Sequence, residues 1–119
     1  HVAKDSVAII SNSAMFFDVC FIVVENDPEF PGGQDSLQAF MERNLRNPRQ
    51  VEGKVYVQFI VERNGRMTNL EVLRGIDEET DEEVLRVMRL MPRWIPGRQR
   101  DKLVRVWVRI PVKISPTEQ

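Results

Sequence analysis

The chain has 119 residues, of which 42% are hydrophobic and 29% are charged, and its formal net charge is −1. This length fits one domain with a substantial core and is too short for an ordinary two-domain enzyme. Because the charges nearly cancel, the composition gives no global reason to expect a nucleic acid or an anionic membrane as partner.

Cysteine and histidine each occur once, as Cys20 and His1. A single cysteine excludes an intrachain disulfide, and one of each residue excludes a structural zinc site. A catalytic arrangement that needs histidine would depend on the chain terminus. We therefore expect no enzyme, no cofactor and no metal.

The most apolar stretch runs from Met15 to Val24, but Asp18 interrupts it. It is also much shorter than the ~20 residues that a membrane-spanning helix needs, so we expect no membrane span in this chain.

We interpret residues 1–18 as a leader or linker, 19–114 as one domain and 115–119 as a tail. Val19–Val24 predicts a short extended segment, and the prolines and glycines of residues 28–33 exclude a helix there. A helix is predicted over Gln34–Leu45, ending before Asn47-Pro48. Its apolar stripe comprises Leu37, Phe40, Met41 and Leu45.

A β-hairpin is predicted next. Lys54–Glu62 alternates apolar and polar residues, Met67–Leu73 is a second β-type run, and Asn64-Gly65 lies between them. Asn and Gly tolerate the positive φ angles of a type I′ turn, which is therefore the turn that we expect.

Thr80 and Glu83 have the spacing of a capping box, which predicts a helix from Asp81 to about Leu90, ended by Pro92. Its predicted inward residues are Val84, Val87, Met88 and Met91. The acidic run of residues 77–83 is interpreted as helix capping and solvation.

Leu103–Ile114 predicts a terminal strand. Its first face carries Val104, Val106, Val108, Ile110, Val112 and Ile114, and its second face carries Arg105, Trp107, Arg109 and Lys113. Pro111 has no N–H group, which places the strand at the edge of a sheet or at a bulge. If the nitrogen of Pro111 faces the open side, the backbone groups of Arg105, Trp107 and Arg109 face it too.

Together these elements predict an α+β fold: a small antiparallel sheet, made of the hairpin and the terminal strand, packed by two helices on one face. Trp94 is expected to cover one end of the core. For Trp107 the sequence leaves two interpretations: a ring packed beneath a helix, or an exposed aromatic anchor for a partner.

Several motifs together resemble the C-terminal domain of the TonB family. They are Val23-Val24-Glu25, the Pro-Glu-Phe-Pro-Gly-Gly segment at 28–33, Asn64-Gly65, Leu73-Arg74-Gly75, residues 91–97 and Pro111-Val112. The Pro-Glu-Phe-Pro-Gly-Gly form is that of the Bacteroidetes branch. The chain departs from the family pattern in having Asn47-Pro48 after the first helix and a short connection to the hairpin.

The resemblance implies a non-enzymatic periplasmic domain of an energy transducer anchored in the inner membrane. Such a domain binds the TonB box of a TonB-dependent outer-membrane transporter, while an inner-membrane motor complex supplies proton-driven energy. The implied partner-binding residues are those of the terminal strand: Arg105, Val106, Trp107, Val108 and Arg109. The guest would bind by β-strand addition.

Two alternatives remain. The open edges could pair with a second copy, making a homodimerising interaction module of a regulatory or scaffold protein. The basic residues between 86 and 113 could bind an anion, although we expect no nucleic acid.

Overall fold

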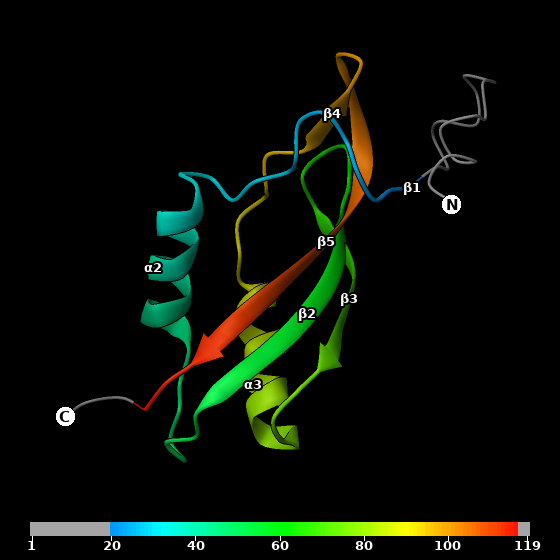
Figure 1. The fold of residues 1–119 in the computed structure, drawn as a ribbon. Helices are drawn as coiled ribbons and strands as arrows, with labels where there is room; N and C mark the ends of the chain where they lie inside the picture. Colours follow the sequence, from blue (N-terminus) through cyan, green and yellow to red (C-terminus); the bar gives the residue numbers. More distant parts are fainter. Residues whose placement is uncertain (1–19, 117–119) are drawn as a thin grey trace.

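The computed structural model describes residues 20–116 (Figure 1). In chain order the elements are β1 (Cys20–Phe21), α2 (Gln34–Asn44), β2 (Gly53–Val61), β3 (Met67–Arg74), α3 (Glu78–Arg89), β4 (Gly97–Gln99) and β5 (Lys102–Ile114). The leader predicted at residues 1–18, and Val19 of the predicted first strand, lie outside the described residues.

The sheet has the order β1-β5-β2-β3, and β4 pairs with the beginning of β5. β5 runs antiparallel to β2 in one unbroken register, from Gly53 opposite Ile114 to Val61 opposite Val106. The predicted antiparallel arrangement of the hairpin and the terminal strand is confirmed, while β1 runs parallel to β5 and makes the whole sheet mixed. The predicted first strand is also shorter than expected among the described residues, because the chain bends at Ile22.

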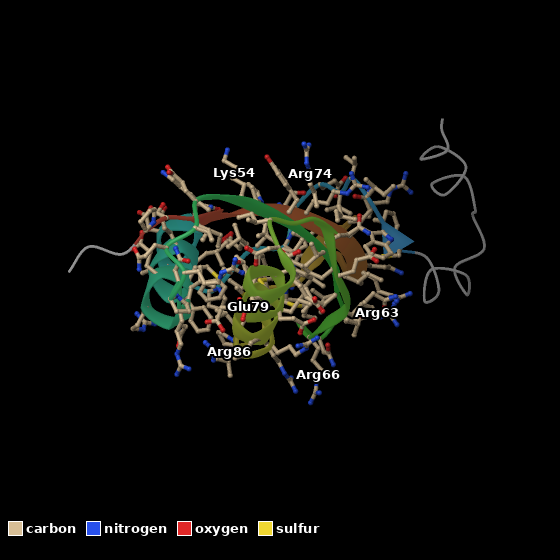
Figure 2. All side chains as sticks on the ribbon, turned by 90° about the horizontal axis from the view of Figure 1, so that it is seen from below. Lys54, Arg63, Arg66, Arg74, Glu79 and Arg86 are labelled. Carbon is tan, nitrogen blue, oxygen red and sulfur yellow. The ribbon has the colours of Figure 1, made fainter. Side chains whose placement is uncertain are left out.

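Both helices lie on one face of the sheet, as predicted (Figure 2). Each contributes its predicted apolar stripe: Leu37 and Met41 of α2 are buried, and so are Val84, Val87 and Met88 of α3. They pack against the inward row of the sheet, which comprises Val55, Val57, Phe59, Val61, Val112 and Ile114. The alternating valines of the terminal strand thus face the core, as the sequence indicates.

Trp94 lies in this core with 5% of its surface exposed. Its ring meets Phe59 and Phe30 edge-on, with ring centroids 5.2 and 5.8 Å away. The indole Nε1–H has no hydrogen-bond partner among the described residues. Trp94 is therefore a packing residue, as predicted.

The hairpin of β2 and β3 is confirmed, but its turn is not type I′. Only Gly65 of the Asn64-Gly65 pair has a positive φ, of 87°. The Gly65 amide donates to the Glu62 carbonyl and the Glu62 amide to the Arg66 carbonyl, which is a type I turn closed by a glycine bulge. A Cβ atom on Gly65 would lie 2.2 Å from the Trp94 carbonyl oxygen, so this close approach also requires glycine.

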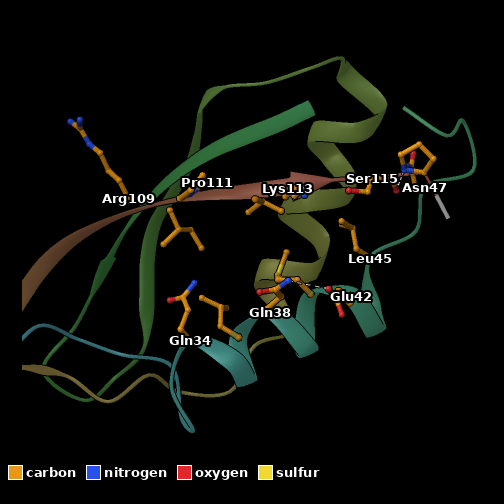
Figure 3. Close-up of a pocket in the computed structure, with 14 residues that line it drawn as sticks. Gln34, Gln38, Glu42, Leu45, Asn47, Arg109, Pro111, Lys113 and Ser115 are labelled. Carbon is orange, nitrogen blue, oxygen red and sulfur yellow. Dashed lines mark hydrogen bonds between the residues drawn. The ribbon is translucent and has the colours of Figure 1, made fainter. Parts of the chain in front are cut away.

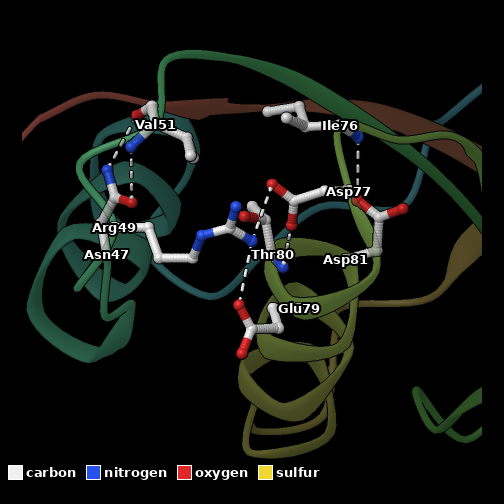
Figure 4. A network of polar contacts seen from close by, with 8 residues as sticks. All are labelled: Asn47, Arg49, Val51, Ile76, Asp77, Glu79, Thr80 and Asp81. Atoms are coloured by element: carbon white, nitrogen blue, oxygen red, sulfur yellow. Dashed lines mark hydrogen bonds and ion pairs between the residues drawn. The ribbon is translucent and has the colours of Figure 1, made fainter.

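The predicted capping box is wrong, because α3 begins three residues earlier. Its N-cap is Asp77, whose Oδ1 accepts the Thr80 amide at 2.8 Å (Figure 4). This hydrogen bond is the main reason that the pKa of Asp77 is lowered. The Nη1 of Arg49 adds an ion pair to Asp77 at 3.4 Å, which ties the loop before β2 to the start of the helix.

β4 was not predicted. It forms a hairpin with β5 in which Arg100 and Asp101 both have positive φ, at 53° and 65°. The Arg100 amide donates to Oε1 of Glu25 at 2.8 Å, so the chain after β1 holds this turn in place.

Candidate functional site

β5 has one occupied edge and one that is only partly occupied. β2 covers the first edge from Val106 to Ile114. β4 pairs with residues 102–104, before the pairing with β2 begins, and on the second edge β1 pairs with Arg105 and Val106. Beyond these, no strand of the described residues pairs with β5. We call residues 107–114 the open edge.

A groove with a volume of about 670 Å³ lies between the open edge and α2 (Figure 3). Leu37 and Met41 of α2 and its C-cap residue, Leu45, line one side, and Ile110 and Val112 of β5 line the other. Polar side chains of the helix also line it: Gln34, Gln38 and Glu42. The groove therefore offers apolar surface beside unpaired strand backbone.

A second hollow, of about 540 Å³, lies on the sheet face that carries no helices. Ile22, Gln58, Trp107 and Arg109 line it. Ile22 is 68% exposed, and Trp107 is half-buried. Trp107 is thus neither a core residue nor a fully exposed anchor; it forms the wall of a hollow beside the open edge.

The two arginines of this face have different surroundings. Arg105 binds Glu62 through two hydrogen bonds, Nε to Oε1 at 2.7 Å and Nη2 to Oε2 at 3.2 Å. Mainly because of Arg105, the pKa of Glu62 is lowered, and a hydrogen bond from Thr68 adds to the effect. Arg109 is exposed and donates from Nε to the neutral amide oxygen of Gln58 at 2.7 Å.

The five residues predicted to bind a partner fall into two groups: the first two lie beside β1, and the other three lie beyond it. Arg105 and Val106 lie next to Cys20 and Phe21, and Val106 is 1% exposed in a small second core with Phe21 and Val104. Trp107, Val108 and Arg109 lie on the open edge. Burial beside this second core also raises the pKa of the Cys20 thiol.

Sequence reasoning did not identify the residues of α2, nor Ile22 and Gln58, as surroundings of the strand. The polar row Gln34, Gln38 and Glu42 has the spacing of one helix face, and Gln38 donates to Glu42 at 3.2 Å. Any solvated amphipathic helix shows this pattern, so it carried no signal of a groove.

The basic residues between 86 and 113 do not form one surface. Arg86 binds Glu83 at 2.7 Å, an interaction that lowers the pKa of Glu83. Arg105 binds Glu62 at 2.7 Å, and Arg109 lies at the open edge.

Within residues 20–116, no group of three or more His, Cys, Asp and Glu side chains is arranged to hold a metal ion. No helix in the same range is long and apolar enough to cross a membrane.

The fold and the site define an α+β domain whose mixed sheet carries two helices on one face and, among the described residues, leaves one edge of its C-terminal strand open over residues 107–114. The family model described as Gram-negative bacterial TonB protein C-terminal matches residues 47–114, more than half of the chain. The chain belongs to this family, as the sequence motifs indicated.

The solution structure of the Helicobacter pylori TonB C-terminal domain has a similar fold. The match has a TM-score of 0.50 and 21% sequence identity, and covers 75% of this chain and 89% of that one. A comparison with curated proteins found no match.

Proposed function

We propose that this is the periplasmic domain of a TonB-type energy transducer and that it binds the TonB box of an outer-membrane transporter by strand addition to the open edge. The full-length protein would be anchored in the inner membrane, where a proton-driven motor complex supplies the energy for nutrient uptake. Membership of the TonB C-terminal family supports a role in interaction rather than catalysis.

The observation that carries this proposal is the open edge itself. A guest strand there would form backbone hydrogen bonds with β5, and its alternate side chains would point into the groove beside α2 and toward the hollow at Trp107. Because β1 lies beside Arg105 and Val106, we place the guest along residues 107–114 rather than along the whole strand.

The other edge of the sheet, β3, is a poorer template for a guest. Its pairing with β2 shifts register twice, and Asn69 has a positive φ of 54°. Such bulges interrupt the ladder that an added strand would continue. β5 has no register shift, which favours it as the binding strand.

Replacing Arg109 by proline tests the proposal. Pro111 is tolerated in β5, and residue 109 has the same backbone direction, so proline at 109 removes an outward N–H group without disturbing the pairing to β2. Arg109→Ala is the matched control, because it loses the same side chain and keeps the N–H group.

Calorimetric titration with a TonB-box peptide from a transporter of the same genome should show Arg109→Pro binding about fivefold more weakly than Arg109→Ala, the value of roughly one backbone hydrogen bond. Equal affinities, with the β2 pairing intact in the amide spectrum, would reject strand addition here. Lys113→Pro and Lys113→Ala form a second pair in case the first variant is unstable.

A further inference from the structure

A third hollow lies at the far edge of the sheet, between β3 and the end of α3. It has a volume of about 470 Å³ and is lined by residues 65–70, Met88, Arg89 and residues 91–93. β2 separates β3 from β5 in the sheet, so this hollow does not adjoin the open edge. We call it the β3 hollow.

Three arginines surround the β3 hollow: Arg66, Arg89 and Arg93. All three are exposed, and among residues 20–116 none has a carboxylate within ion-pair distance. No acidic residue lines the hollow. Elsewhere on the helix side, Arg49 and Arg86 are paired with acidic residues of α3. The β3 hollow is therefore a local concentration of positive charge on a chain of nearly neutral net charge.

The hollow also has apolar surface. Met67, Leu70 and Met91 are half-buried and pack against the main core, leaving part of each side chain exposed beside the arginines. Methionine side chains adapt to varied apolar partners. A ligand that fills this hollow thus needs both negative charge and apolar groups.

We infer that the β3 hollow binds an acidic, apolar-containing peptide segment of a partner protein. Its carboxylates pair with Arg66, Arg89 and Arg93, and its apolar side chains contact Met67, Leu70 and Met91. A nucleic acid backbone lacks apolar groups for this surface, and a flat membrane does not enter a concave site. This inference does not depend on the proposed function, because the two surfaces share no residue.

The probe is a synthetic twelve-residue peptide of alternating Glu and Leu, titrated into the isotope-labelled domain. We expect amide shifts at residues 65–70 and 88–93, and an affinity that falls as salt is added. Arg66→Gln, Arg89→Gln and Arg93→Gln should each weaken binding about threefold, as partly exposed ion pairs do.

Arg74→Gln is the matched control. Arg74 is the last residue of β3, and its side chain points to the opposite side of the sheet from that of Arg66 (Figure 2). The substitution changes the net charge by the same amount. A second peptide, in which Ser replaces every Leu, should bind at least tenfold more weakly.

Three outcomes would overturn the inference. Arg74→Gln could weaken binding as much as Arg66→Gln, which would indicate a diffuse charge effect. The serine peptide could bind equally well, which would indicate a simple anion site. Vesicles containing anionic lipid could compete for the same arginines, which would indicate a membrane contact.

Discussion

An ion pair with Glu62 distinguishes the two arginines on the face of β5 that carries no helices. Glu62 binds Arg105 through both carboxylate oxygens, whereas Arg109, which lies on the same face of β5 as Arg105, donates to the neutral amide oxygen of Gln58. Arg105 therefore has a structural role beside β1. Arg109 retains guanidinium N–H groups at the open edge.

We predict that Arg105→Gln lowers the free energy of unfolding by about 1 kcal/mol at neutral pH, the upper value for a partly exposed pair. Because the folded pKa of Glu62 lies below its ordinary value of 4.5, the stabilisation is fully present above pH 4.5. It is lost as the pH falls through the lower folded pKa.

Urea unfolding between pH 7 and pH 3 checks this. The difference between the original domain and Arg105→Gln should shrink below pH 4.5, whereas the exposed Arg74→Gln should differ little at any pH. A deficit as large at pH 3 as at pH 7 would show that the carboxylate charge of Glu62 is not the source.

At the scale of elements, the start of α3 depends on contacts that the local sequence does not contain. Asp77 and Thr80 are both good N-cap residues. The structure selects Asp77, because Arg49 contacts its carboxylate and Asp81 accepts the Ile76 amide at 3.0 Å.

We predict that Asp77→Ala destabilises the domain, because the Thr80 amide loses its acceptor. Asp77→Asn should retain most of the stability, since asparagine caps helices about as well as aspartate. Urea midpoints at neutral pH would measure both. If Asp77→Ala matched the original domain while Thr80→Ala did not, the helix would begin at Thr80 after all.

Periodic patterns predicted the elements well. The valine row of β5, the stripe of α2 and the inward residues of α3 all depend on local spacing, and all are confirmed. The parallel pairing of β1 was not predictable, because it joins Cys20 to Arg105, far along the chain. The turn at Arg100-Asp101 lacks glycine and asparagine, so its positive φ angles left no signal in the sequence.

The candidate site was predictable only in part, because local spacing indicates a strand but not which distant segments lie beside it. Alternation and Pro111 indicated an edge strand, and among the described strands residues 107–114 pair only with β2, so that their other edge is open. The sequence could not show that β1 and β4 cover the beginning of that strand, or that α2 lies beside the rest.

At the scale of the whole molecule, an open strand edge raises the question of self-association. Antiparallel pairing of two copies centred on Pro111 would place Arg109 of one copy opposite Lys113 of the other. Like charges directly opposite destabilise a strand pair. The charges of Arg109 and Lys113 therefore disfavour this dimer.

We predict that the domain sediments as a monomer across a concentration series. Arg109→Glu would turn the opposed charges into attractive pairs, so this variant should associate at lower concentration than either the original domain or Arg74→Glu. A dimer of the original domain that Arg109→Glu leaves unchanged would instead favour the homodimerising module.

The most direct test of the central claim is a map of nuclear Overhauser contacts between a TonB-box peptide and the labelled domain. We predict backbone contacts from the peptide to Trp107, Arg109 and Lys113, with the amides of Trp107, Arg109 and Lys113 becoming protected from exchange when the peptide binds. Contacts confined to β3 or α3, with the amides of residues 107–113 unchanged, would contradict strand addition at the open edge.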